Sequence, residues 1–262
     1  MNGIFYEKQS GGLCRKHSLN GYFEKTLINE NEFTNYCREF DNYMKIKFKT
    51  DNKCMNFDLI NSDQNTVISY ILKKNNVYSI YIPFNYVDKY LTERKQNMDF
   101  FFDMTDYIFI FNQNHIWGVR KKLNKYYKVD SLSGVSNISN INSYVKQKNI
   151  GLLIPLHKTG HIINEYKYNI CKIQEYLSQN NTQLLQIRSL LKKNYDNKLL
   201  LDKLEIYIGL CVDILETLNI HSDIIRTYYE FNTEYIESKY KFEPIQKYIK
   251  SIVIKLISVK FI

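Results

Sequence analysis

Gln9-Ser10-Gly11-Gly12-Leu13-Cys14 is a stretch in which a glycine turn leads directly into a cysteine, and the run that follows it, 14–19, has the pattern of a helix start. The paired glycines permit a sharp turn. The N-terminal end of a helix favours an anion such as a thiolate, because the helix dipole is positive there. The stretch therefore predicts a reactive cysteine at the beginning of a helix, with a glutamine amide five residues before it.

Two further chemistry-bearing residues lie far downstream, each at one end of a β-like run. His115 lies at the start of one such run, and Asp130 ends the next. A thiol nucleophile needs a base to take its proton, and the base needs an acid to hold its ring in one tautomer. We therefore predict that Cys14 is the nucleophile of a papain-like thiol hydrolase, with His115 as base and Asp130 as orienting acid. Gln9 and the Cys14 backbone N–H would then bind the oxyanion.

Each of these residues also has a purely structural interpretation. A lone cysteine is most often a small buried hydrophobic residue. An aspartate followed by Ser131-Leu132-Ser133-Gly134 can simply open a turn. The order of the four residue types, each in the local setting that its role requires, favours the catalytic interpretation over the structural one.

Four blocks of sequence occur in one order along the chain. They are Gly3–Gln9 with Leu13-Cys14 and His17–Asn20, then Val67–Leu72, Asn114–Arg120 and Tyr126–Leu132. Together they resemble the Josephin family of deubiquitinating cysteine proteases, over roughly residues 1–157. One departure is that Ile116 follows the histidine where the family usually has tryptophan, so that Trp117 comes one position later.

The resemblance implies both a fold and an activity. The fold would be α+β and papain-like, with a central antiparallel sheet and flanking helices, in a catalytic domain at 1–157. The activity would be thiol-dependent hydrolysis of isopeptide or peptide bonds at the C-terminal glycine of ubiquitin, so that ubiquitin or polyubiquitin is the expected partner. Residues beside the catalytic positions would contact the substrate: Gly12, Leu13, Asn114 and Trp117.

Two other functions are compatible with the same residues. One is a catalytically weak or inactive adaptor that binds ubiquitin. The other is a different thiol enzyme on the same fold, such as an acyltransferase or a protease for ubiquitin-like proteins. The adaptor predicts affinity without turnover. A panel of ubiquitin and ubiquitin-like substrates separates the other protease from a deubiquitinase.

Hydrophobic periodicity predicts the secondary structure of the first part of the chain. Helices are expected near 14–23, 31–45 and 64–75, and strands at 77–82, 106–112, 115–122, 125–130 and 150–156. Turn residues make 106–130 a meander of three antiparallel strands, which would bring His115 and Asp130 side by side. The segment 135–149 is polar, with a weak helical period.

Residues 158–262 have a different pattern. Apolar residues recur at helical spacing there, for example Leu200, Leu204, Tyr207, Cys211, Ile214 and Leu218. We predict a bundle of four or five helices that recognises a protein partner or substrate, or braces the catalytic part. The apolar segment 252–257 is also compatible with a strand.

Composition limits the remaining classes. The 262 residues are 44% hydrophobic, which excludes general disorder. Five cysteines without a CxxC pair suit a reducing compartment, and we expect neither a metal site nor a cofactor. The start of the chain lacks the apolar core of a signal peptide, and no apolar run approaches the ~20 residues of a membrane span. We therefore expect a soluble protein of the cytoplasm or nucleus.

The formal net charge of +9 raises the question of nucleic-acid binding. The positive residues are scattered as pairs, such as Lys73-Lys74 and Lys121-Lys122, rather than gathered into a stripe. No recognised nucleic-acid motif accompanies them. We expect neither a nucleic-acid nor a membrane partner.

Overall fold

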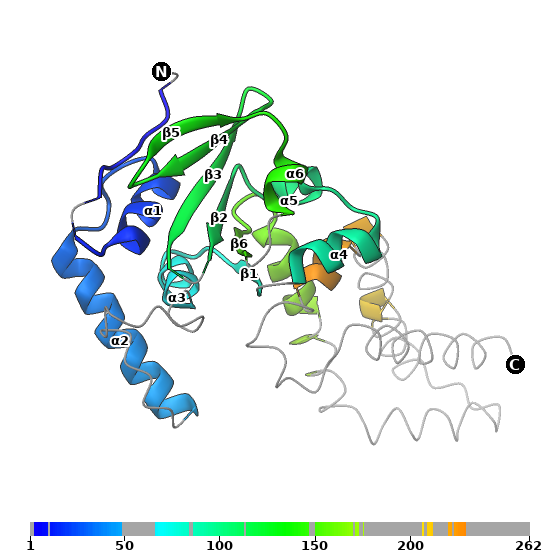
Figure 1. Cartoon of the computed structure of the whole chain (residues 1–262). Coiled ribbons are helices and arrows are strands. Elements are labelled where there is room, and N and C mark those ends of the chain that lie inside the picture. The colour runs from blue at the N-terminus through cyan, green and yellow to red at the C-terminus, as the bar shows by residue number, and fades with distance from the viewer. Residues whose placement is uncertain are drawn as a thin grey trace, which may run out of the picture. The chain divides into compact units, whose positions relative to one another are not determined.

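The computed structural model describes residues 3–9, 11–48, 66–83, 86–112, 114–146 and 150–169, together with short pieces between 171 and 228. The chain divides into two compact units, Met1–Lys158 and Thr159–Ile262. Every chemistry-bearing residue predicted from the sequence belongs to the first unit, whose elements are labelled in Figure 1.

The first unit is built on a six-stranded antiparallel sheet with the order β1-β6-β2-β3-β4-β5. The strands are β1 (Ser79–Ile82), β2 (Tyr107–Phe111), β3 (Ile116–Lys122), β4 (Lys125–Asp130), β5 (Gly134–Ile138) and β6 (Gly151–Pro155). The meander predicted for 106–130 is confirmed as β2, β3 and β4. The last strand, β6, returns to pair with both β1 and β2. The α+β class with a central antiparallel sheet is thereby confirmed.

Helices cover both faces of the sheet (Figure 1). On one face lie α1 (Cys14–Phe23) and α3 (Thr66–Lys74), and α2 (Glu30–Phe48) packs against α3. On the other lie α4 (Tyr86–Arg94), α5 (Met98–Met104) and α6 (Ile141–Val145). Because neither face is open to water, β2 and β6 are buried along their whole length. This explains why their sequences are continuous apolar runs rather than alternating ones.

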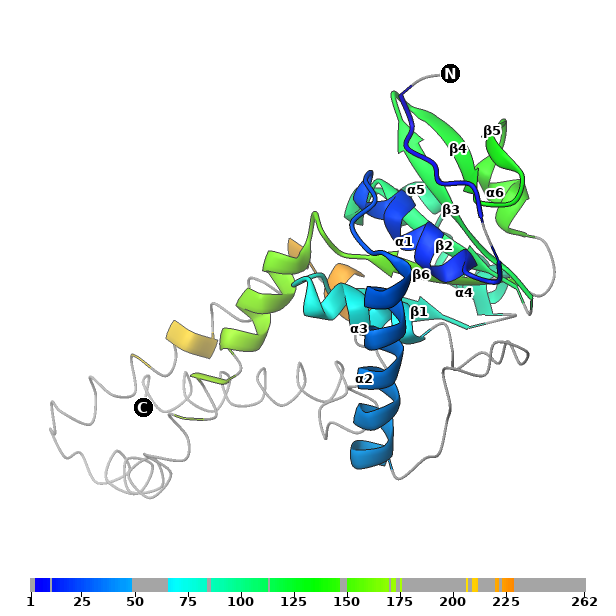
Figure 2. The same cartoon turned by 90° about the vertical axis from the view of Figure 1, so that its left-hand side faces the viewer.

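The α1–α3 face forms one core cluster. Alternate residues of β2, Tyr107, Phe109 and Phe111, point into it beside Leu19 of α1 and Ile71 of α3. Figure 2 shows α1, α2 and α3 together on this side of the sheet. The three helices predicted from periodicity are therefore present.

Three elements differ from the sequence-based expectation. We did not predict α4 or α5, although α5 begins at an Asn97 cap whose side chain accepts from the Asp99 backbone N–H. The weak helical interpretation of 135–149 is wrong for its first part, because β5 occupies it. The β5 sequence is polar and becomes a strand through its pairing with β4 at the edge of the sheet.

In the second unit, residues 160–169 are helical, and Ile162, Ile163 and Tyr166 are buried at helical spacing. Short helical pieces recur at 209–211 and 223–228. Most of the apolar stripes predicted for 158–262, and the segment 252–257, lie outside the described residues. Among the helices that the structure describes, none combines the length and the apolar character required to cross a membrane.

Candidate active site

The structure brings a sulfur, an imidazole and a carboxylate together at one end of the sheet. Cys14 is the first residue of α1, His115 directly precedes β3, and Asp130 is the last residue of β4. The Nε2 atom of His115 lies 2.8 Å from Oδ1 of Asp130. The thiol of Cys14 forms a hydrogen bond with the His115 ring. Because Asp130 engages Nε2, Nδ1 is the ring nitrogen that faces the sulfur.

A short loop fixes the position of His115. Asn112, at the end of β2, accepts the backbone N–H groups of Asn114 and His115 through its side-chain oxygen, at 2.9 and 2.8 Å. Its own backbone N–H donates to the His115 carbonyl at 3.0 Å. These bonds close the turn between β2 and β3. They therefore fix the position of the His115 ring at this end of the sheet.

The electrostatic environment favours a thiolate paired with an imidazolium. Burial alone raises the pKa of the Cys14 thiol, but the hydrogen bond from His115, the charge of Arg15 and the Ile116 backbone together hold this pKa below its ordinary value. Burial lowers the pKa of His115, but its bonds to Cys14 and Asp130 outweigh burial and raise this pKa. Both shifts act in the direction that transfers the proton from sulfur to nitrogen, which is the activation that a thiol nucleophile needs.

Asp130 is held ionised. Its side chain is almost entirely buried, which by itself raises the pKa of the carboxyl group. Hydrogen bonds from Lys128, the Leu132 backbone, His115 and Ser133 outweigh burial and hold this pKa far below its ordinary value. A permanently ionised acid can accept the Nε2 proton of His115 and keep the ring in the tautomer that presents Nδ1 to the thiol.

Gln9 is anchored by the residue that follows Asp130. The Ser131 hydroxyl donates to Oε1 of Gln9 at 2.8 Å, and the Gln9 backbone N–H donates to the Ser131 carbonyl at 2.8 Å. The side-chain Nε2 donates to the carbonyl of Gly11, at 2.5 Å, where the chain turns with a positive φ of +66°. Since Nε2 carries two hydrogens, one remains for an oxyanion. Sequence reasoning missed Ser131, because no local pattern links it to Gln9.

A partly buried polar network holds the N-terminal segment against α1. The Glu7 carboxylate contacts Nδ1 of His17 at 2.6 Å, Nδ2 of Asn20 at 2.9 Å and the Thr26 hydroxyl at 2.9 Å. Burial raises the pKa of Glu7, but these partners and Lys16 outweigh burial and lower it. Because Gln9 is two residues from Glu7, the network also sets where the Gln9 amide lies. Sequence analysis did not assign Glu7 this role.

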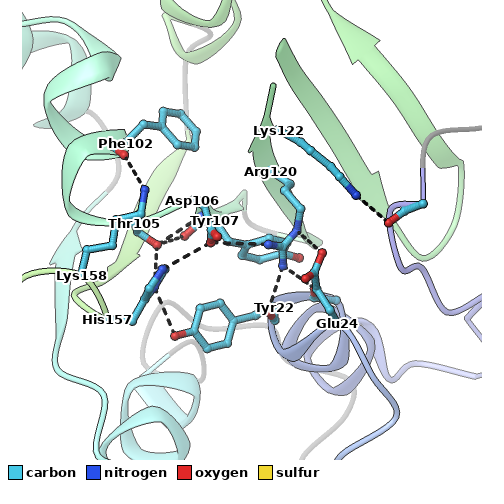
Figure 3. Close-up of polar contacts among 12 residues, drawn as sticks. Tyr22, Glu24, Phe102, Thr105, Asp106, Tyr107, Arg120, Lys122, His157 and Lys158 are labelled. Carbon is cyan, nitrogen blue, oxygen red and sulfur yellow. Dashed lines mark hydrogen bonds and ion pairs between the residues drawn. The ribbon is translucent and has the colours of Figure 1, made fainter. Parts of the chain in front are cut away.

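The opposite end of α1 is held by Arg120 of β3 (Figure 3). One guanidinium nitrogen donates to the carbonyls of Gly21 and Tyr22, both at 2.9 Å. These carbonyls belong to the last turn of α1, where acceptors lack the usual N–H four residues on. The Gly21 carbonyl also accepts from the Glu24 backbone N–H at 3.4 Å. Further ion pairs join Arg120 to Glu24 and Asp106, at 3.5 and 3.4 Å. The helix that carries Cys14 is therefore held by Glu7 along its middle and by Arg120 at its last turn.

The four expected substrate-contacting residues lie in different settings. Gly12 and Asn114 are exposed beside the catalytic residues. The Leu13 side chain belongs to the core cluster, so only its backbone borders the site. Trp117 is buried and stacks on the His115 ring, with ring centroids 5.8 Å apart. Leu132, which sequence analysis did not select, is 64% exposed two residues after Asp130.

The described residues contain no cluster of three or more histidine, cysteine or acidic side chains able to hold a metal ion. The chemistry that the arrangement offers is nucleophilic attack by sulfur with acid–base assistance from an imidazole. Comparison of the chain with protein-family models and with curated proteins found no match.

Proposed function

We propose that this protein is a cysteine-type deubiquitinase with a papain-like Josephin fold in residues 1–157. The observation that carries the proposal is the chain of contacts from Cys14 through His115 to Asp130, with Gln9 tied to the same loop as the acid. These residues lie in the sequence blocks that resemble the Josephin family, and that resemblance supplies ubiquitin as the substrate.

The first chemical step would be attack of the Cys14 thiolate on the carbonyl carbon of the C-terminal glycine of ubiquitin. The carbonyl oxygen becomes an oxyanion, which the Cys14 backbone N–H and the second hydrogen of Gln9 Nε2 would stabilise. Loss of one such donor typically slows the reaction ~10²–10³-fold. The oxyanion geometry requires Gln9 to stay where Ser131 and Gly11 hold it.

The second step releases the amine. As the tetrahedral intermediate collapses, the imidazolium of His115 gives its proton to the departing nitrogen, and a thioester joins Cys14 to ubiquitin. The neutral imidazole then takes a proton from water, whose oxygen attacks the thioester carbonyl. The C–S bond breaks, which frees the C-terminal carboxyl group of ubiquitin and restores the Cys14 thiolate beside the imidazolium. Throughout both steps, Asp130 would keep Nδ1 of His115 directed at the reacting atoms.

For the second unit we propose a helical bundle that recognises a protein partner or substrate. The support is the apolar stripes of the sequence and the helical residues at 160–169. If so, a variant that lacks the residues after 158 should keep a reactive Cys14. We expect a small thiol reagent to modify Cys14 in this variant at the same rate as in the full chain.

The experiment that tests the function is labelling with ubiquitin that carries a C-terminal electrophile. We expect the full chain to form one covalent adduct, the Cys14→Ala variant to form none, and the adduct to map to Cys14 by peptide mass spectrometry. Equal labelling of Cys14→Ala, or no labelling of the native chain, contradicts the proposal. A control variant is Cys37→Ala, since Cys37 is buried in α2 and is expected to be dispensable.

A parallel panel identifies the neighbouring functions. Turnover of a ubiquitin-like fluorogenic substrate in place of the ubiquitin one identifies a different protease. Ubiquitin affinity without an adduct or turnover identifies an adaptor.

A further inference from the structure

Asp130 has a second cationic neighbour besides His115. Lys128 lies two residues earlier on β4, and alternate residues of a strand point to the same face. Its Nζ atom is 2.7 Å from Oδ2 of Asp130 and 3.2 Å from the Ser133 hydroxyl. It also lies over the indole ring of Trp117, 5.5 Å from the ring centroid. The lysine is therefore held in place by contacts from three sides.

The carboxylate is consequently shared between two cations. Oδ1 accepts from His115, whereas Oδ2 accepts from Lys128. The carboxylate is 4% exposed and the lysine side chain 26% exposed, so water screens this arrangement only in part. The Lys128 ammonium group partly neutralises the negative charge of Asp130, which would otherwise stabilise only the His115 imidazolium. The same ammonium group also disfavours a proton on the His115 ring.

We propose that Lys128 is a positioning residue that acts through Asp130 to set the upper pH limit of the Cys14–His115 ion pair. The inference rests on the proposed thiol chemistry but not on the identity of the substrate. Lys128 lies in the block Tyr126–Leu132, which resembles the Josephin family, but the sequence analysis assigned it no role.

The direction of the effect follows from the charges. The reactive form contains a thiolate and an imidazolium, and it is lost when pH rises through the pKa of His115. A fixed positive charge beside Asp130 makes the imidazolium less stable, so this loss occurs at lower pH than with a neutral residue at 128. The other charged or titratable groups that act on this pair are Arg15 at Cys14, and Tyr107 and Tyr144 near Asp130. None of these changes when residue 128 is replaced.

The test uses two small alkylating reagents on the full chain, with modification of the Cys14 peptide followed by mass spectrometry. Iodoacetamide is neutral and reports the thiolate. Iodoacetate is an anion and is attracted by the imidazolium, so its rate falls when His115 loses its proton. The midpoint of that fall measures the upper limit of the ion pair without any ubiquitin.

Lys128→Gln keeps a hydrogen-bond donor but removes the charge, and Lys128→Arg keeps the charge. We expect Lys128→Gln to move the iodoacetate midpoint upward by roughly one pH unit and Lys128→Arg to leave it in place. Lys125→Gln is the matched control, because Lys125 is an exposed residue of the same strand and its loss changes the net charge equally. Its midpoint is expected to stay at the native value.

Lys128→Met provides a second uncharged variant, should the glutamine disturb folding. The inference is overturned if both uncharged variants retain the native midpoint and lose only rate, which is the result expected of a merely structural lysine. It is also overturned if Lys128→Arg shifts the midpoint as far as Lys128→Gln does. Failure of ubiquitin labelling would contradict the proposed function. The iodoacetate midpoint could still be measured, because it requires no ubiquitin, so the two failures are distinguishable.

Discussion

Helices α1 and α3 pack on the same face of the sheet, but different interactions bury them. In α3 the contact is apolar: Val67, Ile68, Ile71 and Leu72 are fully buried, and the two lysines at its end are exposed. In α1 every residue from 14 to 21 is buried, although most of these residues are polar. Some of their polar groups, those of His17 and Asn20 among them, are matched instead to Glu7.

The difference fits what a helix that carries the proposed nucleophile at its first residue would require. Apolar packing is non-directional, and it tolerates small rotations and shifts of a helix. Hydrogen bonds are directional, so the bonds from Glu7 to the middle of α1 and from Arg120 to its last turn fix the rotation of α1 about its axis. We infer that α1 determines chemistry, whereas α3 contributes mainly to stability.

The largest expected effect is on chemistry at α1. Replacing His115 by Gln removes the base that takes the Cys14 proton, and we expect kcat/KM for a ubiquitin-based fluorogenic substrate to fall by about 10⁴-fold or more. Alkylation of Cys14 should then require a pH near the ordinary thiol pKa of ~8.5. The Ile71→Ala variant, assayed where it is folded, is expected to keep native reactivity. If Cys14 of the His115→Gln variant were still alkylated at neutral pH, the inference that α1 determines chemistry would be contradicted.

The second expected effect is on stability at α3. Ile71→Ala leaves a cavity in the core cluster, and we expect the free energy of unfolding to fall by about 2–5 kcal/mol, measured with urea. Ile46→Ala makes the same change at a position of α2 that is 82% exposed, and it should alter stability by less than about 0.5 kcal/mol. Equal losses at the two positions would remove the distinction between buried and exposed apolar residues.

The third effect concerns the polar burial of α1. Glu7→Gln removes the charge from bonds to His17, Asn20 and Thr26, and we expect a loss of about 2 kcal/mol at neutral pH. Because the pKa of Glu7 is lower in the folded protein than the ordinary value of 4.5, its charge stabilises the fold above pH 4.5. The stabilisation is lost as pH falls through the lowered pKa. The difference between the native chain and the variant should therefore shrink at acid pH.

Urea unfolding at several pH values measures this effect. Glu93→Gln is the control, since Glu93 is largely exposed and its ion pair with Lys89 spans 3.8 Å on the surface of α4. It is expected to cost less than about 0.5 kcal/mol. A Glu7→Gln loss that did not shrink at any acid pH at which the protein stays folded would show that charge is not what holds the N-terminal segment.

The smallest effect is on the anchoring of Gln9. Ser131→Ala should lower kcat/KM by roughly tenfold, less than the ~10²–10³-fold expected for Gln9→Ala. Because Ser131 is proposed to act through Gln9, the double variant should be no slower than Gln9→Ala alone. Ser133→Ala is the matched control, since that hydroxyl donates to Asp130 at 2.9 Å, and its effect should add to that of Gln9→Ala. Additive losses for Ser131 would show that it acts independently.

Much of the first unit could be predicted from local pattern. The apolar spacing of 64–75 gave a helix that the structure places at Thr66–Lys74, and the strand expected at 125–130 is β4. Turn residues predicted the β2–β3–β4 meander, because a short connection between two apolar runs leaves antiparallel pairing as the natural outcome.

Other elements could not be read from local pattern. The polar sequence of β5 forms a strand only because β4 offers an unpaired edge. The position of β6 between β1 and β2 depends on pairing between segments far apart in the chain. The partners of Glu7, Arg120, Lys128 and Ser131 were likewise not predicted, since a charged or hydroxyl side chain has no periodic signature of its own.

The amino-acid sequence alone determined which residue types are available for chemistry and the strand meander that brings a histidine next to an acid, because short-range periodicity and turn residues act within a few positions. Only the tertiary structure decided how Gln9 reaches the loop after Asp130, how α1 is held at its middle and its last turn, and that a lysine shares the carboxylate with the histidine. Those features depend on hydrogen bonds between distant segments, whose direction and distance exist only once the sheet and its helices have assembled.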